Sequence, residues 1–354
     1  MTHREEFEGW PAILGLLVER RDLTSGQAEA AINQILQGDS TASQMTAFMV
    51  ALRAKGETSD ELQGMLHAVR EAGNRVTLPD DMAVRAIDLV GTGGDKSHSV
   101  NISTMSALVV AGAGVPVCKH GNRAASSRCG SADLLEAAGV AIELDPLGVE
   151  ACVQATGFGF CLAARFHPAF RHTGPSRREI GIPTAFNLLG PMANPAAISN
   201  MLVGVAFPHM MEPMAAALAS RGVSRAWVVH GHGGLDELAV SGANVVHELR
   251  DGRVHVFDID AADFGVARST IDDIRGGTAS ENLATMRRLF AGESGPVRDI
   301  VLFNAACALF VCGMVADVAE GLSVAATSLD SGAAARVLEL TVAESTRQAA
   351  RMAI

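Results

Sequence analysis

Residues 119–133 bring a lysine, a histidine, an asparagine and two arginines together between two apolar runs, in a chain that has only three lysines. The segment reads Lys119-His120-Gly121-Asn122-Arg123-Ala124-Ala125-Ser126-Ser127-Arg128-Cys129-Gly130-Ser131-Ala132-Asp133. A lysine and a histidine that end an apolar strand are costly to bury unless a partner compensates them. The segment therefore predicts a loop that binds an anionic ligand.

A second polar loop, Gly91-Thr92-Gly93-Gly94-Asp95, follows the apolar run 86–90, and Asn101-Ile102-Ser103-Thr104 opens the next helical pattern. Backbone amides without side-chain bulk can cradle phosphate oxygens, and hydroxyls at a helix start add donors. The spacing matches neither the P-loop nor the dinucleotide-binding fingerprint, and a glycine cluster of this length is equally typical of a tight turn. Because both loops follow strands, the leading hypothesis is one phosphate-binding site.

Two adjacent carboxylates, Asp236 and Glu237, lie in a third glycine-rich stretch, which follows the apolar run 226–230. Such carboxylates are often only solvated. Hard oxygen ligands of this kind also suit Mg²⁺ that is bound together with a substrate phosphate. The pair is therefore a candidate metal site.

Cations concentrate in two further places of this acidic chain, 165–167 and 176–179. For Arg178 a solvated helix end is the more common role. The stretch 186–195 follows them and contains Gly-Pro and Asn-Pro steps, which punctuate a chain sharply. Its expected role is architectural.

The elements that must position these residues change in kind near residue 81. Three capping boxes, at Thr24, Thr41 and Thr58, each open an amphipathic helical pattern and predict a small helical bundle. Short β-rich runs then alternate with helices, which predicts an α/β fold with a mainly parallel central sheet and surrounding helices. The expected strands are 86–90, 115–119, 141–144, 160–163, 201–206, 226–230 and 254–258, and the helices among them include 103–113, 131–138 and 209–221. Ligands of such sheets bind beyond the strand C-termini, where the polar loops fall.

Composition limits the partners and the compartment. With 354 residues, 48% of them hydrophobic, the chain can bury a large core, and its net charge of −11 argues against nucleic acid or an anionic membrane as the main partner. The six cysteines form no C-x-x-C pair and are expected to be buried free thiols. The N-terminus lacks the layout of a signal peptide, and no apolar run is long enough to cross a bilayer. We expect a cytoplasmic protein.

Taken in chain order, the motifs resemble those of the anthranilate phosphoribosyltransferase family. They are Gly91-Thr92-Gly93-Gly94-Asp95, Asn101-Ile102-Ser103-Thr104, Lys119-His120-Gly121-Asn122-Arg123, Gly130-Ser131-Ala132-Asp133, Phe186-Asn187-x-Leu189-Gly190-Pro191 and Gly234-Leu235-Asp236-Glu237. The resemblance implies a small helical domain, residues 1–80 completed by 170–195, and a larger α/β domain, residues 81–169 and 196–354. It also implies a homodimer formed through the helical domain.

The resemblance further implies a reaction and its ligands. The reaction is transfer of phosphoribose from 5-phosphoribosyl 1-diphosphate to the amino group of anthranilate, with release of pyrophosphate, in tryptophan biosynthesis. Mg²⁺ is the implied cofactor, with two ions in each subunit. The implied donor-binding residues are Gly91, Thr92, Gly93, Gly94, Asp95, Asn101, Ser103, Thr104 and Lys119. Those on the anthranilate side are Gly91, His120, Asn122, His167 and Arg177, and the Mg²⁺ ligands are Ser103, Asp236 and Glu237. No residue is assigned as a general acid or base, because an arylamine needs little deprotonation before it attacks.

Three positions depart from the family pattern, and one of them, Met192 in place of a usual leucine, conserves volume and should matter little. Lys96 stands where glycine is common, which predicts a restricted loop or an added cation near the donor, and Cys129 replaces a small polar residue. Two alternatives stay open: a pyrimidine nucleoside phosphorylase, which shares the general fold, and a non-catalytic paralogue that binds nucleic acid. The acidic balance and the intact Asp236-Glu237 pair count against the second alternative.

Overall fold

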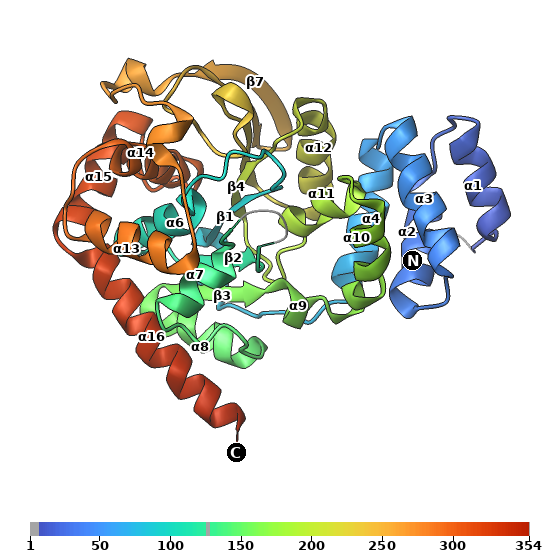
Figure 1. Ribbon diagram of the computed structural model, residues 1–354, viewed down its shortest axis with the longest axis horizontal. Helices are drawn as coiled ribbons and strands as arrows, with labels where there is room; N and C mark the ends of the chain where they lie inside the picture. Colours follow the sequence, from blue (N-terminus) through green and yellow to red (C-terminus); the bar gives the residue numbers. More distant parts are fainter. Residues whose placement is uncertain (1–6, 125–127, 354) are drawn as a thin grey trace.

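A computed structural model describes residues 7–124 and 128–353, which form a helical bundle beside a larger α/β body (Figure 1). The predicted order, a small helical part first and a larger α/β part afterwards, is confirmed. The bundle consists of α1 (Trp10–Val18), α2 (Ser25–Gln37), α3 (Ala42–Lys55) and α4 (Ser59–Glu71). A short helix, α5 (Asp80–Arg85), leads into the sheet.

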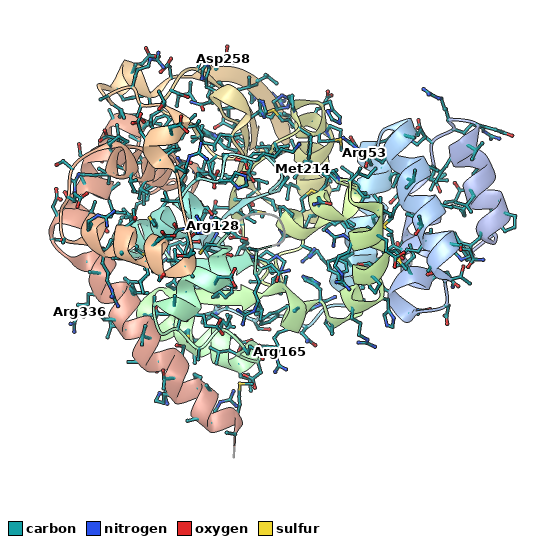
Figure 2. All side chains as sticks on the ribbon, viewed as in Figure 1. Arg53, Arg128, Arg165, Met214, Asp258 and Arg336 are labelled. Atoms are coloured by element: carbon teal, nitrogen blue, oxygen red, sulfur yellow. The ribbon has the colours of Figure 1, made fainter. Side chains whose placement is uncertain are left out.

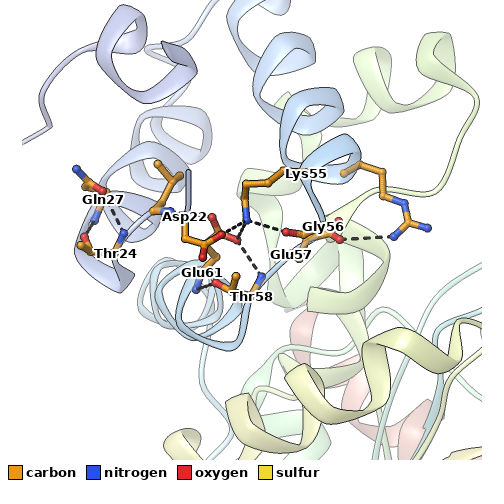
Figure 3. Close-up of polar contacts among 10 residues, drawn as sticks. Asp22, Thr24, Gln27, Lys55, Gly56, Glu57, Thr58 and Glu61 are labelled. Carbon is orange, nitrogen blue, oxygen red and sulfur yellow. Dashed lines mark hydrogen bonds and ion pairs between the residues drawn. The ribbon is translucent and has the colours of Figure 1, made fainter. Parts of the chain in front are cut away.

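The three predicted capping boxes begin α2, α3 and α4 as expected, and a buried ion pair ties the bundle together (Figure 3). Lys55 Nζ, at the end of α3, donates to Glu61 Oε2 at 3.0 Å and to Asp22 Oδ1 at 2.7 Å. Glu61 also accepts the backbone amides of Leu23 and Thr58, each at 2.9 Å. A buried carboxylate with this many donors fixes how three helices meet, because each lost donor would leave a charge uncompensated.

The sheet has seven strands in the order β3-β2-β1-β4-β5-β6-β7. They are β1 (Ile87–Gly91), β2 (Val117–Gly121), β3 (Phe158–Leu162), β4 (Asn200–Gly204), β5 (Arg225–His230), β6 (Asn244–Arg250) and β7 (Arg253–Ile259). The first five strands in sequence run parallel, and β6 and β7 add an antiparallel edge, so the mainly parallel sheet is confirmed.

The strand predictions err in two places. The predicted strand at 141–144 is wrong, since this run has neither helical nor strand structure. The backbone amide of Ala141 donates to Ser345 Oγ, on a C-terminal helix, at 3.0 Å, and the run belongs to none of the described strand pairs. The sequence analysis did not predict β6, whose sequence Asn-Val-Val-His-Glu-Leu-Arg does not alternate apolar and polar side chains. A tight Asp251-Gly252 turn with positive φ at both residues joins it to β7.

Helices cover both faces of the sheet, and alternate strand residues feed two cores. Ile87 and Leu89 of β1 face one core, and Met201 and Val203 of β4 face the other. The first core is completed by α6 (Ile102–Gly112), α7 (Ser131–Ala137), α13 (Ala279–Phe290), α14 (Pro296–Val311), α15 (Val318–Asp330) and part of α16 (Ala333–Met352). The second is completed by α8 (Pro146–Thr156), α12 (Met211–Arg221) and the bundle. The second core is therefore continuous with the helical bundle.

Between β3 and β4 the chain returns to the bundle. It does so through α9 (Ala163–Phe166), a short 3₁₀ turn, α10 (Gly174–Ile180) and α11 (Ala185–Met192). The helix α10 packs on α3, and α11 packs on α3 and α4. In the described residues the six cysteines are free, five of them buried, as expected. No described helix is both long and apolar enough to cross a membrane.

Candidate active site

The three predicted loops leave the carboxyl ends of β1, β2 and β5, at one edge of the parallel sheet. Residues 125–127 of the second loop lie outside the described part of the chain. One cavity is lined by Ser103, Asp236, Glu237 and the strand residues around them. The fold thus brings together residues that are more than a hundred positions apart in the sequence.

Three carboxylates converge beside this cavity. Asp95, Asp236 and Glu237 each offer one oxygen, and these oxygens lie within 4.8 Å of one another. Burial, and then the neighbouring Asp95 carboxylate, raise the pKa of Asp236 to about 7. Burial and both neighbours raise the pKa of Glu237 well above its ordinary value. Like charges this close oppose ionisation unless a cation joins them.

Glycines make room for the acidic pair. A Cβ atom on Gly91 would lie 2.4 Å from Asp236 Oδ2, and one on Gly204 would lie 1.6 Å from the backbone oxygen of Asp236. Gly93 N donates a hydrogen bond to the carboxylate oxygen Oδ2 of Asp236 at 2.6 Å. The glycine-rich loop therefore binds the Asp236 carboxylate through the amide of Gly93. Glycine at 91 and at 204 leaves the space that Asp236 occupies, because a side chain at either position would displace Asp236.

Lys119 was expected at the end of a strand, but it lies within β2, two residues before its end at Gly121, and is only 2% exposed. Its Nζ donates to the backbone oxygen of Leu89 and, at 3.3 Å, to Ser103 Oγ. Burial lowers the pKa of Lys119, while the carboxylates of Asp88 and Glu237 oppose this shift. A cation is thereby fixed beside the serine hydroxyl at the start of α6.

The two predicted histidines meet edge to face, with the ring centroids of His120 and His167 5.2 Å apart. His120 Nδ1 donates to the backbone oxygen of Gly190 at 3.0 Å, which leaves Nε2 as a buried acceptor with no donor among the described residues. Burial, and then His167, lower the pKa of His120 well below its usual value. His167 Nε2 bonds the backbone oxygen of Ala193 at 2.9 Å, so His167 also fastens α11 to the segment before it.

The two neighbouring arginines of α10 have different surroundings. Arg177 is half-buried and stacks over the ring of Phe186, 5.7 Å from its centroid, whereas Arg178 is exposed. Burial lowers the pKa of Arg177, and no charged or hydrogen-bonding partner among the described residues opposes this shift. The cation of Arg177 is thus oriented by an aromatic ring and has no counter-charge among the described residues.

The polar loop after β2 is held by its own charges. Arg123 forms a bidentate pair with Glu136, at 2.7 and 3.0 Å, and Asp133 accepts the amides of Ala124 and Gly130. The side chain of Asn122 is exposed beside them. Arg123 therefore serves the loop rather than a ligand.

The acidic set fits a divalent metal. Asp95 Oδ2 and Glu237 Oε2 are buried, and no N–H or hydroxyl of the described residues donates to either. Ser103 Oγ lies in the same cavity wall as the pair. Carboxylate and hydroxyl oxygens are the ligands that Mg²⁺ prefers. Asp95, expected only as a donor-binding residue, belongs to this set as well.

Comparison with known proteins decides the family. The model described as "Glycosyl transferase family, a/b domain" matches residues 83–335, and that described as "Glycosyl transferase family, helical bundle domain" matches residues 11–73. The anthranilate phosphoribosyltransferase of Rhodococcus jostii (strain RHA1) is 50% identical over 335 residues, which cover 93% of this chain and 91% of that relative. The chain belongs to the anthranilate phosphoribosyltransferase family.

Solved structures of anthranilate phosphoribosyltransferases share the architecture. That of the Thermus thermophilus enzyme has a TM-score of 0.88 and 39% identity, and covers 94% of this chain and 99% of its own. The Saccharomyces cerevisiae enzyme in complex with PRPP and Mg has a TM-score of 0.87 and 26% identity, and covers 96% and 98%. The same yeast enzyme in complex with 4-fluoroanthranilate has a TM-score of 0.85 and 26% identity, with coverages of 96% and 99%. Neither alternative function is favoured by these relatives.

Two of the departures from the anthranilate phosphoribosyltransferase pattern, Lys96 and Cys129, have a structural outcome. Lys96 adopts a φ of 59°, in the left-handed region that glycine enters without strain, so the predicted restriction of the loop is a real backbone cost. Cys129 Sγ donates to Asn101 Oδ1 at 3.3 Å, and Asn101 Nδ2 donates to the backbone oxygen of Cys129 at 3.1 Å. Cys129 thus fastens the second loop to the start of α6.

Sequence reasoning missed the buried polar residues that support this anthranilate phosphoribosyltransferase site. Asp88, in β1, accepts the amide of His120 and, at 2.8 Å, Nδ2 of Asn194. Asn304, in α14, exchanges hydrogen bonds with the backbone of Leu238, directly after the acidic pair. Only one signal was available, an isolated polar residue within an apolar run. Asn304 interrupts the apolar run 300–315 in this way, but its hydrogen-bond partner cannot be read from the sequence.

Proposed function

We propose that the chain catalyses transfer of the 5-phosphoribosyl group from 5-phosphoribosyl 1-diphosphate to the amino nitrogen of anthranilate, releasing pyrophosphate. Family membership and the ligands named for the yeast relative support the proposal. The observation that carries it is the single edge of the sheet where a glycine-rich loop, Lys119 and three carboxylates meet. This edge offers amides and a cation for phosphates, and acids for a metal.

The donor site follows from where charge develops. Departure of pyrophosphate leaves positive character on the ribose and gathers negative charge on the leaving group, so fixed donors aimed at that group stabilise the transition state. The residues proposed for this role are Gly91, Thr92, Gly93, Gly94, Asp95, Asn101, Ser103, Thr104 and Lys119. Lys119 is held rigidly by Leu89 and Ser103, so little reorganisation is needed when the charge forms.

Ser103, Asp236 and Glu237, together with Asp95, would hold Mg²⁺, two ions in each subunit. When bound, Mg²⁺ supplies positive charge to the diphosphate oxygens of the donor. The chain's own contribution is the placement of Asp236 by Gly93 N and by the space at Gly91 and Gly204. The carboxylates must also lose protons on binding, because burial raises the pKa of both Asp236 and Glu237.

The anthranilate side is proposed at Gly91, His120, Asn122, His167 and Arg177. The guanidinium of Arg177 has a planar fork that matches a carboxylate, and the ring of Phe186 orients it. His120 stays neutral because burial depresses its pKa, so it can accept a hydrogen bond but is a weak base. Catalysis then rests on positioning and leaving-group stabilisation, since an arylamine lone pair is already free to attack.

The oligomeric state, the domain limits and the cellular location stay predictions. We propose a homodimer formed through the helical domain, supported by the exposed apolar side chains of Val18 on α1 and Val50 on α3. We propose domain limits of 1–80 with 170–195, and 81–169 with 196–354, supported by the packing of α10 and α11 on the bundle. A cytoplasmic location is also proposed.

A fluorescence assay tests the function. Purified protein given Mg²⁺ and 5-phosphoribosyl 1-diphosphate should consume anthranilate, with loss of its fluorescence and stoichiometric release of pyrophosphate. Omission of Mg²⁺, or its removal by a chelator, should abolish turnover and re-addition should restore it. No consumption of anthranilate together with turnover of thymidine and phosphate would instead identify a nucleoside phosphorylase.

A further inference from the structure

We propose that Arg53, in the helical bundle, is a positioning residue that holds the glycine-rich loop of the donor site through the ring of Phe207. The inference deepens the proposed function and rests on it. Arg53 lies on α3, where the bundle approaches α12 and Met214 (Figure 2). No motif that identified the site includes Arg53 or Phe207.

The contacts of Arg53 cross from the bundle to the α/β body. Its guanidinium carbon lies 5.4 Å from the centroid of the Phe207 ring, within the range of a cation–π contact. Its Nη1 lies 3.1 Å from His209 Nε2 and 3.5 Å from Glu57 Oε2. Because arginine can only donate, His209 must present Nε2 as an acceptor. The guanidinium is thus held between a carboxylate of its own domain and two rings of the other.

The Phe207 ring in turn lies beside the glycine-rich loop. A Cβ atom added to Gly94 would lie 3.8 Å from Phe207 Cζ, so the ring borders the space next to this glycine. The residue before Phe207, Ala206, donates its amide to Thr92 Oγ1 at 3.1 Å. Thr92 N donates to the backbone oxygen of Gly204 at 2.9 Å. A shift of Phe207 would therefore reach the loop both through the ring and through the backbone that carries it.

This loop needs outside support. Gly93 and Gly94 both have positive φ, of 67° and 85°, and lack side chains that could anchor them. Glycine-rich backbone gains the most conformational freedom when released, so a neighbouring ring that limits its movement preorganises the amides for phosphate. Arg53 fixes that ring from a second domain, and so makes donor affinity depend on how the bundle sits against the sheet.

A simpler role for Arg53 is neutralisation of Glu57, whose side chain is fully buried. The two roles differ in their consequences. If Arg53 served only to neutralise Glu57, a second change, Glu57→Gln, would restore the donor KM of a variant that lacks Arg53. If the stack on Phe207 matters, the double variant stays impaired, and lysine, which lacks the planar guanidinium, substitutes poorly.

The experiment compares Arg53→Ala, Arg53→Lys, Arg53→Ala/Glu57→Gln and Phe207→Leu in the full-length protein. We expect Arg53→Ala, Arg53→Ala/Glu57→Gln and Phe207→Leu each to raise the KM for 5-phosphoribosyl 1-diphosphate by about three- to tenfold, with the anthranilate KM changed less than twofold. A further double variant, Arg53→Ala/Phe207→Leu, should have a donor KM little higher than that of Phe207→Leu alone. The control is Arg21→Ala, which breaks an exposed ion pair with Glu19 in the same bundle and should leave both KM values unchanged. Restoration of the donor KM by Glu57→Gln, full rescue by Arg53→Lys, or equal changes in both KM values would overturn the proposal.

Amide hydrogen exchange of the free protein gives a readout that does not depend on turnover. In Arg53→Ala, exchange in the peptide containing residues 92–95 should rise about tenfold, while the peptide of β2 should be unchanged. Unchanged exchange at 92–95 would refute the positioning role even for an active enzyme. Failure of the wild-type protein to consume anthranilate would refute the proposed function instead, whatever the exchange pattern.

Discussion

Replacement of Gly91 by alanine tests how the acidic pair is placed. In the structure the new Cβ atom would lie 2.4 Å from Asp236 Oδ2 and 3.0 Å from both Asp236 Cγ and its backbone oxygen. Real Cβ contacts essentially never fall under 3.0 Å. The carboxylate must therefore retreat by at least about 0.6 Å, and the nearby backbone leaves it little choice of direction. The hydrogen bond from Gly93 N, 2.6 Å long, would be lost or distorted.

The expected cost falls on catalysis more than on folding. A displacement approaching 1 Å at a group that positions substrate can cost about 10²-fold in rate. We expect kcat/KM to fall by about 10²-fold, which corresponds to about 2.7 kcal/mol of transition-state stabilisation. The Mg²⁺ concentration that gives half the maximal rate should rise in parallel, and the melting temperature should fall by only a few degrees.

The assay is the initial rate of anthranilate consumption across a Mg²⁺ titration, with Gly15→Ala as the matched control. Gly15 lies inside α1 with nothing within 4 Å of a new Cβ atom, so its replacement should leave activity unchanged. Adding Gly91→Ala to Asp236→Ala should cost nothing further, because the first change acts through the second residue. A Gly91→Ala enzyme within twofold of wild type, or additive losses in the double variant, would refute the reasoning.

Two further outcomes are expected. Arg177→Ala should raise the anthranilate KM at least tenfold with little change in the donor KM, whereas Arg178→Ala, one residue away and exposed, should change neither; equal effects of the two variants on the anthranilate KM would remove Arg177 from its role. Burial lowers the pKa of His167 to about 4, below the 6.5 of the unfolded chain, so its contribution to stability is complete above pH 6.5 and is lost as the pH falls toward 4. Urea unfolding measures this loss as the free energy of unfolding at pH 7.5 minus that at pH 5, which should be about 2 kcal/mol larger for wild type than for His167→Gln. Glutamine keeps a donor for the backbone oxygen of Ala193. Equal losses in the two proteins would mean that His167 is not buried in its neutral form.

The sequence predicts local structure well where one side chain controls it. The capping boxes at Thr24, Thr41 and Thr58 are complete within four residues, so the starts of α2, α3 and α4 follow from sequence alone. The run at 141–144 has the composition of a strand, but strand pairing needs a neighbour. Its backbone meets Ser345, about two hundred residues later, and this long-range choice leaves no local trace.

The sequence likewise predicts one part of the candidate site and not the other. Segments rich in glycine and charge at or near strand ends identify Gly91, Lys119 and Asp236 as candidates for binding or catalysis. The side chains that hold them in place are solitary polar residues within apolar surroundings, such as Asp88 beneath His120. A buried carboxylate of this kind looks like an exception to the hydrophobic pattern, and only the fold supplies the amide that compensates it.

Gly91 and Gly93 belong to one sequence motif, but the structure gives a different reason for each glycine. A sequence motif presents Gly91 and Gly93 as equivalent members of one phosphate-binding loop. Gly93 has a φ of 67° and open space where a Cβ atom would stand, so it is needed for its backbone conformation. Gly91 has no positive φ and is needed because Asp236 occupies the space of its side chain. Alanine at 93 should therefore act first by straining the backbone of the loop, whereas alanine at 91 should act first by displacing the Asp236 carboxylate.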